Sequence, residues 1–196
     1  MKRFLPALTC LTVALMLLPF SAGSSANSKF NTYPNLPAPI AKEEILITSA
    51  GQAVESSILQ SIAEKLNLQA DYRPRALATD LYEYESVVIV VGFSKHGLSQ
   101  TVRNFKEELN RVKALVMEAE KSSLSVILVD ISGMLRNDNR SWQLVEELIP
   151  YTTYYIGMKS SERMDYLRFM LKENKVPTTL VDDISGIEVP FNSAYR

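Results

Sequence analysis

Short apolar runs alternate with longer amphipathic segments along the chain from residue 44 onward. The runs are rich in Val, Ile and Leu and show no polar alternation, a pattern that predicts strands buried on both faces of a sheet. The segments between them place apolar residues three or four positions apart, which predicts helices with one buried face. Strands are therefore expected at residues 45–48, 70–73, 87–91, 125–129, 153–156 and 178–181.

The starts of the helices can be predicted from local residues. Ser49-Ala50-Gly51-Gln52 matches the S-x-x-Q capping box, so the first helix is expected directly after the first strand. Ser160 or Ser161 is expected to cap the last helix. The longest helix should follow the 92–99 loop, with a buried face of Val102, Phe105, Leu109, Val112, Leu115, Val116 and Ala119. Its solvent face is expected to carry Arg103, Lys106, Glu107, Glu108, Arg111 and Lys113.

Alternating strands and helices predict an α/β fold with a doubly wound, mostly parallel sheet and helices on both faces, in three layers. The first helix leads to the weak strand at 70–73, which is expected at the sheet edge. This arrangement favours a flavodoxin-like or Rossmann-like strand order 2-1-3-4-5, with a sixth strand at the far edge. The single domain is expected to span residues 43–184, followed by a C-terminal tail at 185–196.

The N-terminus has the three-part pattern of a secretory signal peptide. Two basic residues precede an apolar run of about 17 residues, and small residues follow it. Residues 1–26 are therefore expected to be removed, which predicts a periplasmic or extracellular protein. The alternative is an uncleaved membrane anchor, for which the run is short and is interrupted by two prolines.

Composition narrows the chemistry of the mature chain. Without residues 1–26, 19 basic residues face 22 acidic ones, and a net charge of −3 argues against a nucleic-acid partner. Cys10 is the only cysteine and lies in the signal segment, so no disulfide or thiolate nucleophile is expected. Residues 27–42 contain Pro34, Pro37 and Pro39 and are expected to form an extended linker.

In a doubly wound sheet, ligands bind outside the carboxyl ends of the strands, where the strand order reverses. That point lies between the first and third strands, so the site is expected in the loops at 48–52 and 92–99, with 130–133 and 158–161 on the rim. The candidate ligand-binding residues are Ser49, Gly51, Gln52, Gly92, Ser94, Lys95, His96, Gly97, Asp130 and Ser132. Hydrogen-bond donors, a positive charge and a helix start favour a small polar or anionic ligand.

Each candidate also has a purely structural interpretation. The alternatives are a helix cap for Ser49 and Gln52, turn geometry for Gly92 and Gly97, and a loop cap for Asp130. His96 is the only histidine, and solvent exposure is the alternative to a catalytic role. No phosphate-binding glycine motif and no G-x-S-x-G nucleophile elbow occurs, so no catalytic residue is assigned. No cofactor is expected, and the adjacent acids at 182–183 are interpreted as solvated rather than as a metal site.

Several segments resemble an uncharacterised family of exported bacterial proteins. They are ILITSAGQ at 45–52, VVIVVG at 87–92, SKHG at 94–97, the helix at 107–119 and VPTTLV at 176–181. The resemblance covers most of residues 44–190. Because the family is a domain of unknown function, the resemblance implies an α/β fold and export, and it carries over no catalytic residue.

Three functions are open at this point. The leading hypothesis is an exported small-molecule-binding module for a polar or anionic metabolite, serving a transporter or receptor. The first alternative is a hydrolase or transferase that uses Ser94, His96 and Asp130 in the loops. The second is an envelope interaction protein without a ligand. Membrane contact is expected only through the signal segment before its cleavage.

Export should remove the N-terminal segment, because the small residues after the apolar run fit a signal-peptidase site. The mature protein is expected to begin near Asn27. N-terminal sequencing of secreted material tests this expectation, and a chain that still starts at Met1 would contradict it.

Overall fold

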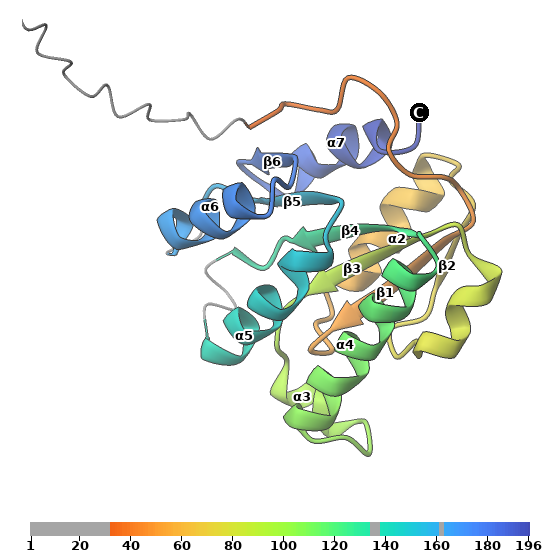
Figure 1. The fold of residues 1–196 in the computed structure, drawn as a ribbon, viewed down its shortest axis with the longest axis vertical. Helices are drawn as coiled ribbons and strands as arrows, with labels where there is room; N and C mark the ends of the chain where they lie inside the picture. The colour runs from red at the N-terminus through yellow and green to blue at the C-terminus, as the bar shows by residue number, and fades with distance from the viewer. Residues whose placement is uncertain (1–31, 134–137, 161–162) are drawn as a thin grey trace, which may run out of the picture.

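The computed structural model of the chain describes residues 32–133, 138–160 and 163–196. Six strands form one sheet in the order β2-β1-β3-β4-β5-β6, which confirms the predicted flavodoxin-like order with a sixth strand at the far edge (Figure 1). The predicted signal peptide, residues 27–31 of the expected linker and Ser161 lie outside the described residues. None of the helices in the described ranges has the length and apolar character needed to span a bilayer.

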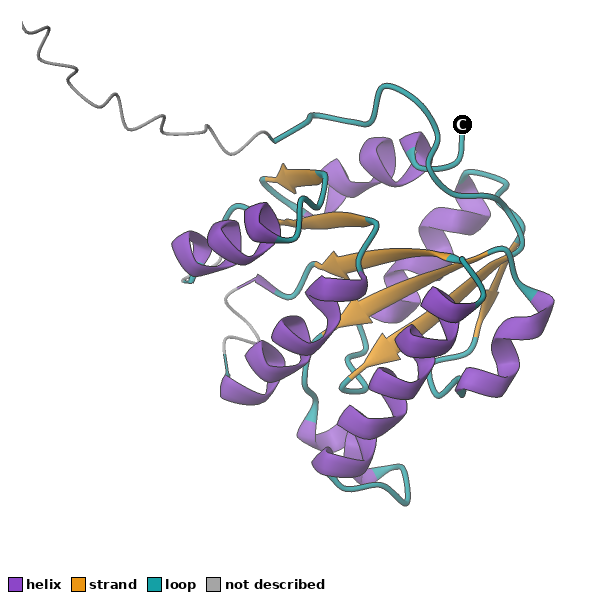
Figure 2. Ribbon diagram, viewed as in Figure 1, coloured by secondary structure: helices purple, strands orange, loops and turns teal. Residues whose placement is uncertain are grey.

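The strands at the centre of the sheet are completely buried or nearly so. They are β1 (Ile45–Ala50), β3 (Ser86–Val91), β4 (Ser125–Asp130) and β5 (Tyr154–Met158). The edge strands are β2 (Ala70–Tyr72) and β6 (Thr178–Val181). Every neighbouring pair is parallel, so all strands point the same way (Figure 2). Burial on both faces explains why the strand sequences show no polar alternation.

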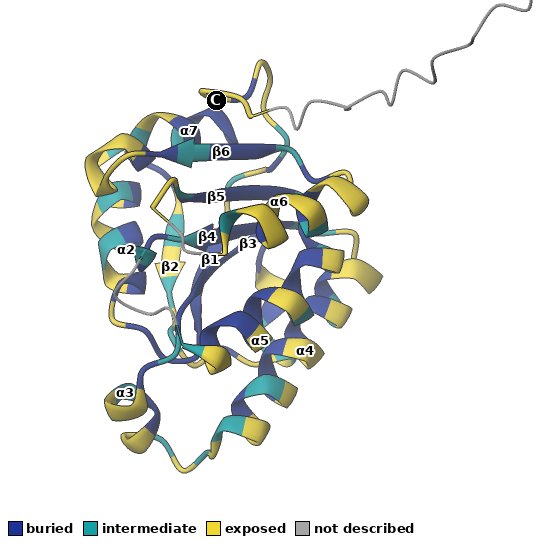
Figure 3. Cartoon of the chain, turned by 90° about the vertical axis from the view of Figure 1, so that its left-hand side faces the viewer, coloured by how far each residue is buried: buried dark blue, intermediate teal, exposed yellow. Residues whose placement is uncertain are grey.

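Helices cover the two faces of the sheet as separate layers. One layer contains α4 (Phe105–Lys121), α5 (Asn139–Leu148) and α6 (Met164–Glu173). The other contains α2 (Ser56–Lys65) and α7 (Glu188–Ser193). Short 3-10 helices connect the elements: η1 (Ala78–Glu83), η3 (Ile149–Tyr151) and η4 (Ile184–Ile187). Figure 3 shows the sheet buried between helices whose outer faces are exposed.

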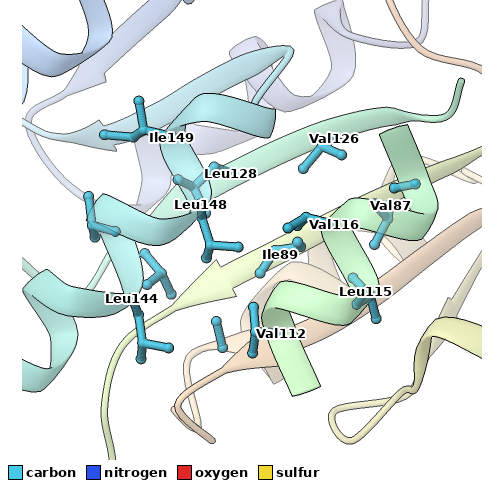
Figure 4. Close-up of a cluster of buried hydrophobic side chains, with 14 of the residues drawn as sticks. Val87, Ile89, Val112, Leu115, Val116, Val126, Leu128, Leu144, Leu148 and Ile149 are labelled. Carbon is cyan, nitrogen blue, oxygen red and sulfur yellow. The ribbon is translucent and has the colours of Figure 1, made fainter. Parts of the chain in front are cut away.

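Alternate side chains of the central strands enter two different cores. Ile89 packs with residues of α4 and α5, among them Val112 and Leu144 (Figure 4). Its neighbours Val88 and Val90 point to the opposite face and pack with residues of α2 and α7. The apolar runs of the sequence therefore supply both cores at once.

The helix predicted after the 92–99 loop is in fact two helices. Residues Lys95–Ser99 form the short α3, and α4 begins only at Phe105. Asn104 sets this start, because its side chain accepts a hydrogen bond from Glu107 N (3.0 Å) while Glu107 Oε2 accepts one from Asn104 N (2.6 Å). Val102 was therefore wrongly placed on the buried face: its relative exposure is 102%.

The segment before β1 packs on the domain rather than extending away from it. Leu36 is buried, and its backbone N–H donates to Ser193 Oγ (2.9 Å). The N–H groups of Ile40 and Ala41 both donate to the carbonyl of Ala194, at 3.0 and 2.9 Å. Figure 1 shows this segment, in orange, running past α7.

The residues expected to form a C-terminal tail belong to the hydrophobic core. Residues 185–196 contain most of η4 and all of α7. Phe191 and Ala194 have no exposed surface, and Tyr195 packs edge-to-face on Phe191 with ring centroids 5.6 Å apart. The apolar side chains of this short segment fill the α2 face of the sheet, where the sequence pattern was too brief to predict a helix.

Ile89→Ala should lower the free energy of unfolding by about 2–5 kcal/mol, because it removes a large side chain that is 0% exposed. Val102→Ala is the matched control and should change stability by less than about 0.5 kcal/mol. Urea denaturation of both variants tests the assignment. A small loss for Ile89→Ala would contradict the burial of the central strand.

Candidate functional site

The two loops at the reversal of strand order are in direct contact. Ser94 N donates to Gly51 O (2.8 Å), and Gln52 and Phe93 form an isolated antiparallel bridge. A Cβ atom on Gly51 would lie 2.6 Å from the carbonyl oxygen of Gly92. The backbones of the two loops therefore touch at this point and leave no space for a side chain at Gly51.

The predicted capping box does not form. β1 pairs with β3 as far as Ala50, so Ser49 is a strand residue, and its Oγ donates to Ala53 O (3.4 Å). Gly51 and Gln52 then take positive φ angles of 91° and 61°, which turn the chain away before a helix can begin. Helix α2 starts at Ser56 instead.

A buried ion pair lies directly beneath this turn. Glu108 and Arg111 of α4 are 0% and 7% exposed, and two hydrogen bonds join them, Nε to Oε2 (2.9 Å) and Nη2 to Oε1 (2.7 Å). Oε1 of Glu108 also accepts hydrogen bonds from Gly51 N (3.1 Å) and Gln52 Nε2 (2.9 Å). The left-handed turn after β1 is thus held by a side chain from another element.

The same pair reaches the loop after β2. Arg111 donates to the carbonyls of Ser49 and Ala76, the latter at 2.6 Å from Nη1. Gln52 Nε2 also donates to Pro74 O (3.1 Å). Burial alone would raise the pKa of Glu108, but the hydrogen bonds and charge of Arg111, with the donors on Gln52 and Gly51, outweigh it and lower that pKa. Glu108 therefore stays charged, and the contacts of the pair connect helix α4 with the loops after β1 and β2.

Glu108 and Arg111 were predicted on the solvent face of α4, and this prediction was wrong because both side chains are buried. Their spacing carried the necessary signal, because Val112 and Leu115 follow Glu108 at i+4 and i+7 and share its face. The prediction followed the usual exposure of charged side chains and not the position of these two residues on the helix. A charged pair at i and i+3 on an apolar face is the pattern that would have revealed the network.

Several predicted site residues point inward and serve the local fold. Ser94 caps α3, with its Oγ accepting from Gly97 N (3.0 Å). A Cβ atom on Gly97 would lie 2.3 Å from Gln52 O, so this glycine permits the loops to touch. Ser132 is buried, and its Oγ donates to Val91 O (3.4 Å). These side chains are engaged with the chain itself.

Lys95 and His96 are the predicted residues that remain exposed. Lys95 lines an open hollow of about 480 Å³ together with Phe93, Asp138, Asn139 and Arg140. The hollow lies where the loop after β3 meets the start of α5. Lys95 is the one of these five residues that was predicted from the sequence as a site residue.

Aromatic rings form one side of this region. Phe93 and Phe105 pack edge-to-face with centroids 5.5 Å apart. The Arg140 guanidinium carbon lies 4.8 Å from the Phe93 centroid and 5.5 Å from that of Phe105. Both distances are typical of cation–π contact, so the two rings hold the side chain of Arg140 in place.

Asp138 fixes the start of α5 against the loop after β3. Its Oδ1 accepts from the backbone N–H groups of Arg140 (2.9 Å) and Ser141 (3.1 Å), and its Oδ2 accepts from Ser141 Oγ (2.8 Å). Ser141 Oγ in turn accepts from Phe93 N (2.9 Å). Hydrogen bonds therefore hold both segments that line the hollow, the start of α5 and the loop after β3.

Asp130 lies at the end of β4 and is partly exposed. Burial raises its pKa to about 6 and the charge of Glu55 adds to the rise, although hydrogen bonds from Tyr155 and Ser132 favour the charged form. The hydroxyl of Tyr155 donates to Oδ2 (3.3 Å), and its ring occupies the place where a side chain of Gly157 would stand. The raised pKa means that Asp130 is protonated more readily than an ordinary aspartate.

The residues of the enzymatic alternative are not joined. Ser94 Oγ is bonded to Gly97 N, His96 is exposed, and Asp130 is bonded to Tyr155. Within the described ranges no hydrogen bond links these three candidates to one another. In the same part of the chain, no three acidic, His or Cys side chains gather in a way that would hold a metal ion.

One protein family matches this chain. Residues 42–195 match the family described as "Domain of unknown function (DUF6305)". The chain therefore belongs to that family, and the match includes the C-terminal residues that pack into the core. No curated protein matches the chain.

Glu108→Gln should lower the free energy of unfolding at pH 7 by about 3–5 kcal/mol, because it leaves Arg111 charged and buried without its partner. The lowered pKa of Glu108 makes its contribution complete above the ordinary value of 4.5 and lost as the pH falls through the folded-state value. The variant should therefore lose less additional stability than wild type on acidification through this window.

Glu118→Gln on the same helix is the control, since Glu118 pairs with Lys121 at the surface and should contribute less than about 1 kcal/mol. Urea denaturation at pH 7 and at pH 3–5 measures both effects. Equal stability of the Glu108 and Glu118 variants would show that the buried pair does not hold the loops.

Proposed function

We propose that the protein is a binding module for a small anionic ligand, and that the ligand occupies the hollow lined by Phe93, Lys95, Asp138, Asn139 and Arg140. The observation that carries the proposal is a pair of cations, Lys95 and Arg140, in one hollow. Neither forms an ion pair with any carboxylate in the described parts of the chain.

Several other cations of the chain do form ion pairs. Arg111 pairs with Glu108 and also donates to backbone carbonyls, and Lys42, Lys65 and Arg196 pair with glutamates. An unpaired cation is common at a surface, but two in one concavity raise the local potential for an anion. The hollow is therefore better suited to an anionic ligand than to a neutral or cationic one.

The helix starts beside the hollow add to its positive potential. Both α4 and α5 begin here, next to Phe105 and Asn139, and the N-terminal ends of helices carry partial positive charge. Asp138 and Glu107 offset part of this charge, but their carboxylates accept hydrogen bonds from backbone N–H groups of the helix starts. The charges of Lys95 and Arg140 have no such local partner.

The rigid surroundings support binding rather than a structural role alone. The Phe93 loop is hydrogen-bonded to Ser141, and the turn beside it is held by Glu108. A pre-positioned site loses less conformational entropy when a ligand binds. With the predicted export, this module would carry or sense a metabolite outside the cytoplasm, in the service of a transporter or receptor.

The hydrolase or transferase alternative has less support, because Ser94 caps a helix and no hydrogen bond in the described residues joins its side chain to that of His96. The remaining feature in its favour is Asp130, whose pKa is raised to about 6 by burial. A proton carrier without a positioned nucleophile is weak support for a reaction.

Lys95→Ala should weaken anion binding by roughly ten- to a hundredfold, since a charge-assisted hydrogen bond is worth about 1.5–3 kcal/mol. Native mass spectrometry of the purified protein identifies any retained ligand, and calorimetry with that ligand, inorganic phosphate and citrate measures affinity. Lys172→Ala is the matched control, because Lys172 is an exposed lysine on α6, outside the residues that line the hollow. Equal weakening by both substitutions would point to a general charge effect and not to this hollow.

A further inference from the structure

We infer that the group bound in this hollow is an oxyanion with several acceptor oxygens, a carboxylate or a phosphoryl group, and that Arg140 binds two of its oxygens side by side. This inference rests on the proposed function and narrows its ligand class. It follows from the side-chain donors beside the hollow that form no hydrogen bond within the described residues.

Arg140 contacts two aromatic rings and keeps its hydrogen-bond donors. Its guanidinium carbon lies 4.8 Å from the ring centroid of Phe93 and 5.5 Å from that of Phe105. In the described residues no acceptor receives a hydrogen bond from its side chain. A guanidinium presents its N–H donors in its plane, as a fork that matches two coplanar oxygens. Because no acceptor in the described residues takes these N–H donors, bidentate binding of an oxyanion is compatible with the ring contacts.

Asn139 contributes a second donor whose orientation is fixed. Arg163 Nη2 hydrogen-bonds to Asn139 Oδ1 (2.8 Å). A guanidinium only donates, so the atom facing Arg163 must be the amide oxygen, and the NH₂ group is the half that remains. No acceptor in the described parts of the chain takes this NH₂ group. Arg163 is itself held over the ring of Trp142 at 5.2 Å, which limits reorientation of the amide.

The polar groups that line the hollow are thus nearly all donors. Lys95, Asn139 and Arg140 line the hollow, and the donors that they have left are an ammonium group, an amide NH₂ and guanidinium N–H groups. The acceptor among them is Asp138, whose two oxygens already take three hydrogen bonds from the start of α5. A ligand rich in hydroxyl or amine donors would find few partners here. An oxyanion satisfies all three donors with its own lone pairs.

The first test is Arg140→Lys, which keeps the positive charge and removes the planar fork. Calorimetry at low ionic strength compares inorganic phosphate, succinate and sodium chloride, so that a phosphoryl group, a carboxylate and a monatomic anion are distinguished. Wild type should bind at least one of the two oxyanions more tightly than chloride. Arg140→Lys should weaken that oxyanion roughly tenfold or more, because a single-point charge replaces two parallel hydrogen bonds. Arg168→Lys on α6 is the control and should match wild type.

The second test is Asn139→Asp, which exchanges the free donor for an acceptor without a change in size. A carboxylate at this position favours the helix start and the contact with Arg163, so the fold is expected to be retained or stabilised. Oxyanion affinity should nevertheless fall at least tenfold, with thermal melting as the check on folding.

The outcomes separate the two proposals. If Lys95→Ala weakens binding while Arg140→Lys and Asn139→Asp bind as wild type does, the anion site stands and the oxyanion assignment is wrong. Preference for chloride over both oxyanions would lead to the same conclusion. If wild type binds none of the three anions at millimolar concentration, the proposed function and the inference both fail.

Discussion

The carboxyl edge of the sheet depends on two opposite charges buried beneath it. Glu108 and Arg111 leave water at a large desolvation cost, which only their mutual attraction and a complete set of hydrogen bonds can offset. The chain supplies that set from the turn after β1 and the loop after β2. Gly51 N would otherwise be a buried donor without a partner once β1 ends. The pair therefore determines where the strand stops and how the loops at this edge lie.

Charge is used in two opposite ways within this part of the molecule. Arg111 is buried, and each of its three side-chain nitrogens donates to Glu108 or to a backbone carbonyl, so it organises the loops. Arg140 is anchored only through ring contacts, so its hydrogen-bonding edge stays available at the surface. The first arrangement gives rigidity, and the second leaves donors for the proposed ligand. A site built on the first kind of residue can afford exposed, unpaired cations without losing its shape.

The sheet could be predicted from the sequence because its signal is local and redundant. Runs such as 87–91 are apolar at every position, and burial on both faces is the only environment that suits them. Boundaries were harder, since they depend on pairing with distant residues. Ser49 matches a helix cap, yet hydrogen bonds to β3 extend the strand past it. Likewise, the stretch around Phe191 is too short for its sequence to predict a helix. Its packing into the core on the α2 face of the sheet depends on residues that are distant in the chain.

The strand order that defines the candidate edge could be predicted from the sequence, but the residues that line the hollow at this edge could not. Strand order alone located the edge, because any doubly wound sheet reverses between two neighbouring strands. Most polar residues nearest that point form hydrogen bonds within the chain. Ser94, for example, caps helix α3. The lining residues Phe93 and Arg140 and the adjacent ring of Phe105 come from the ends of three elements that meet only when α4 packs beside α5. No local sequence pattern predicts that these three residues come into contact. What the sequence does contain is the donor character of each residue, and tertiary structure decides which donors are left for a ligand.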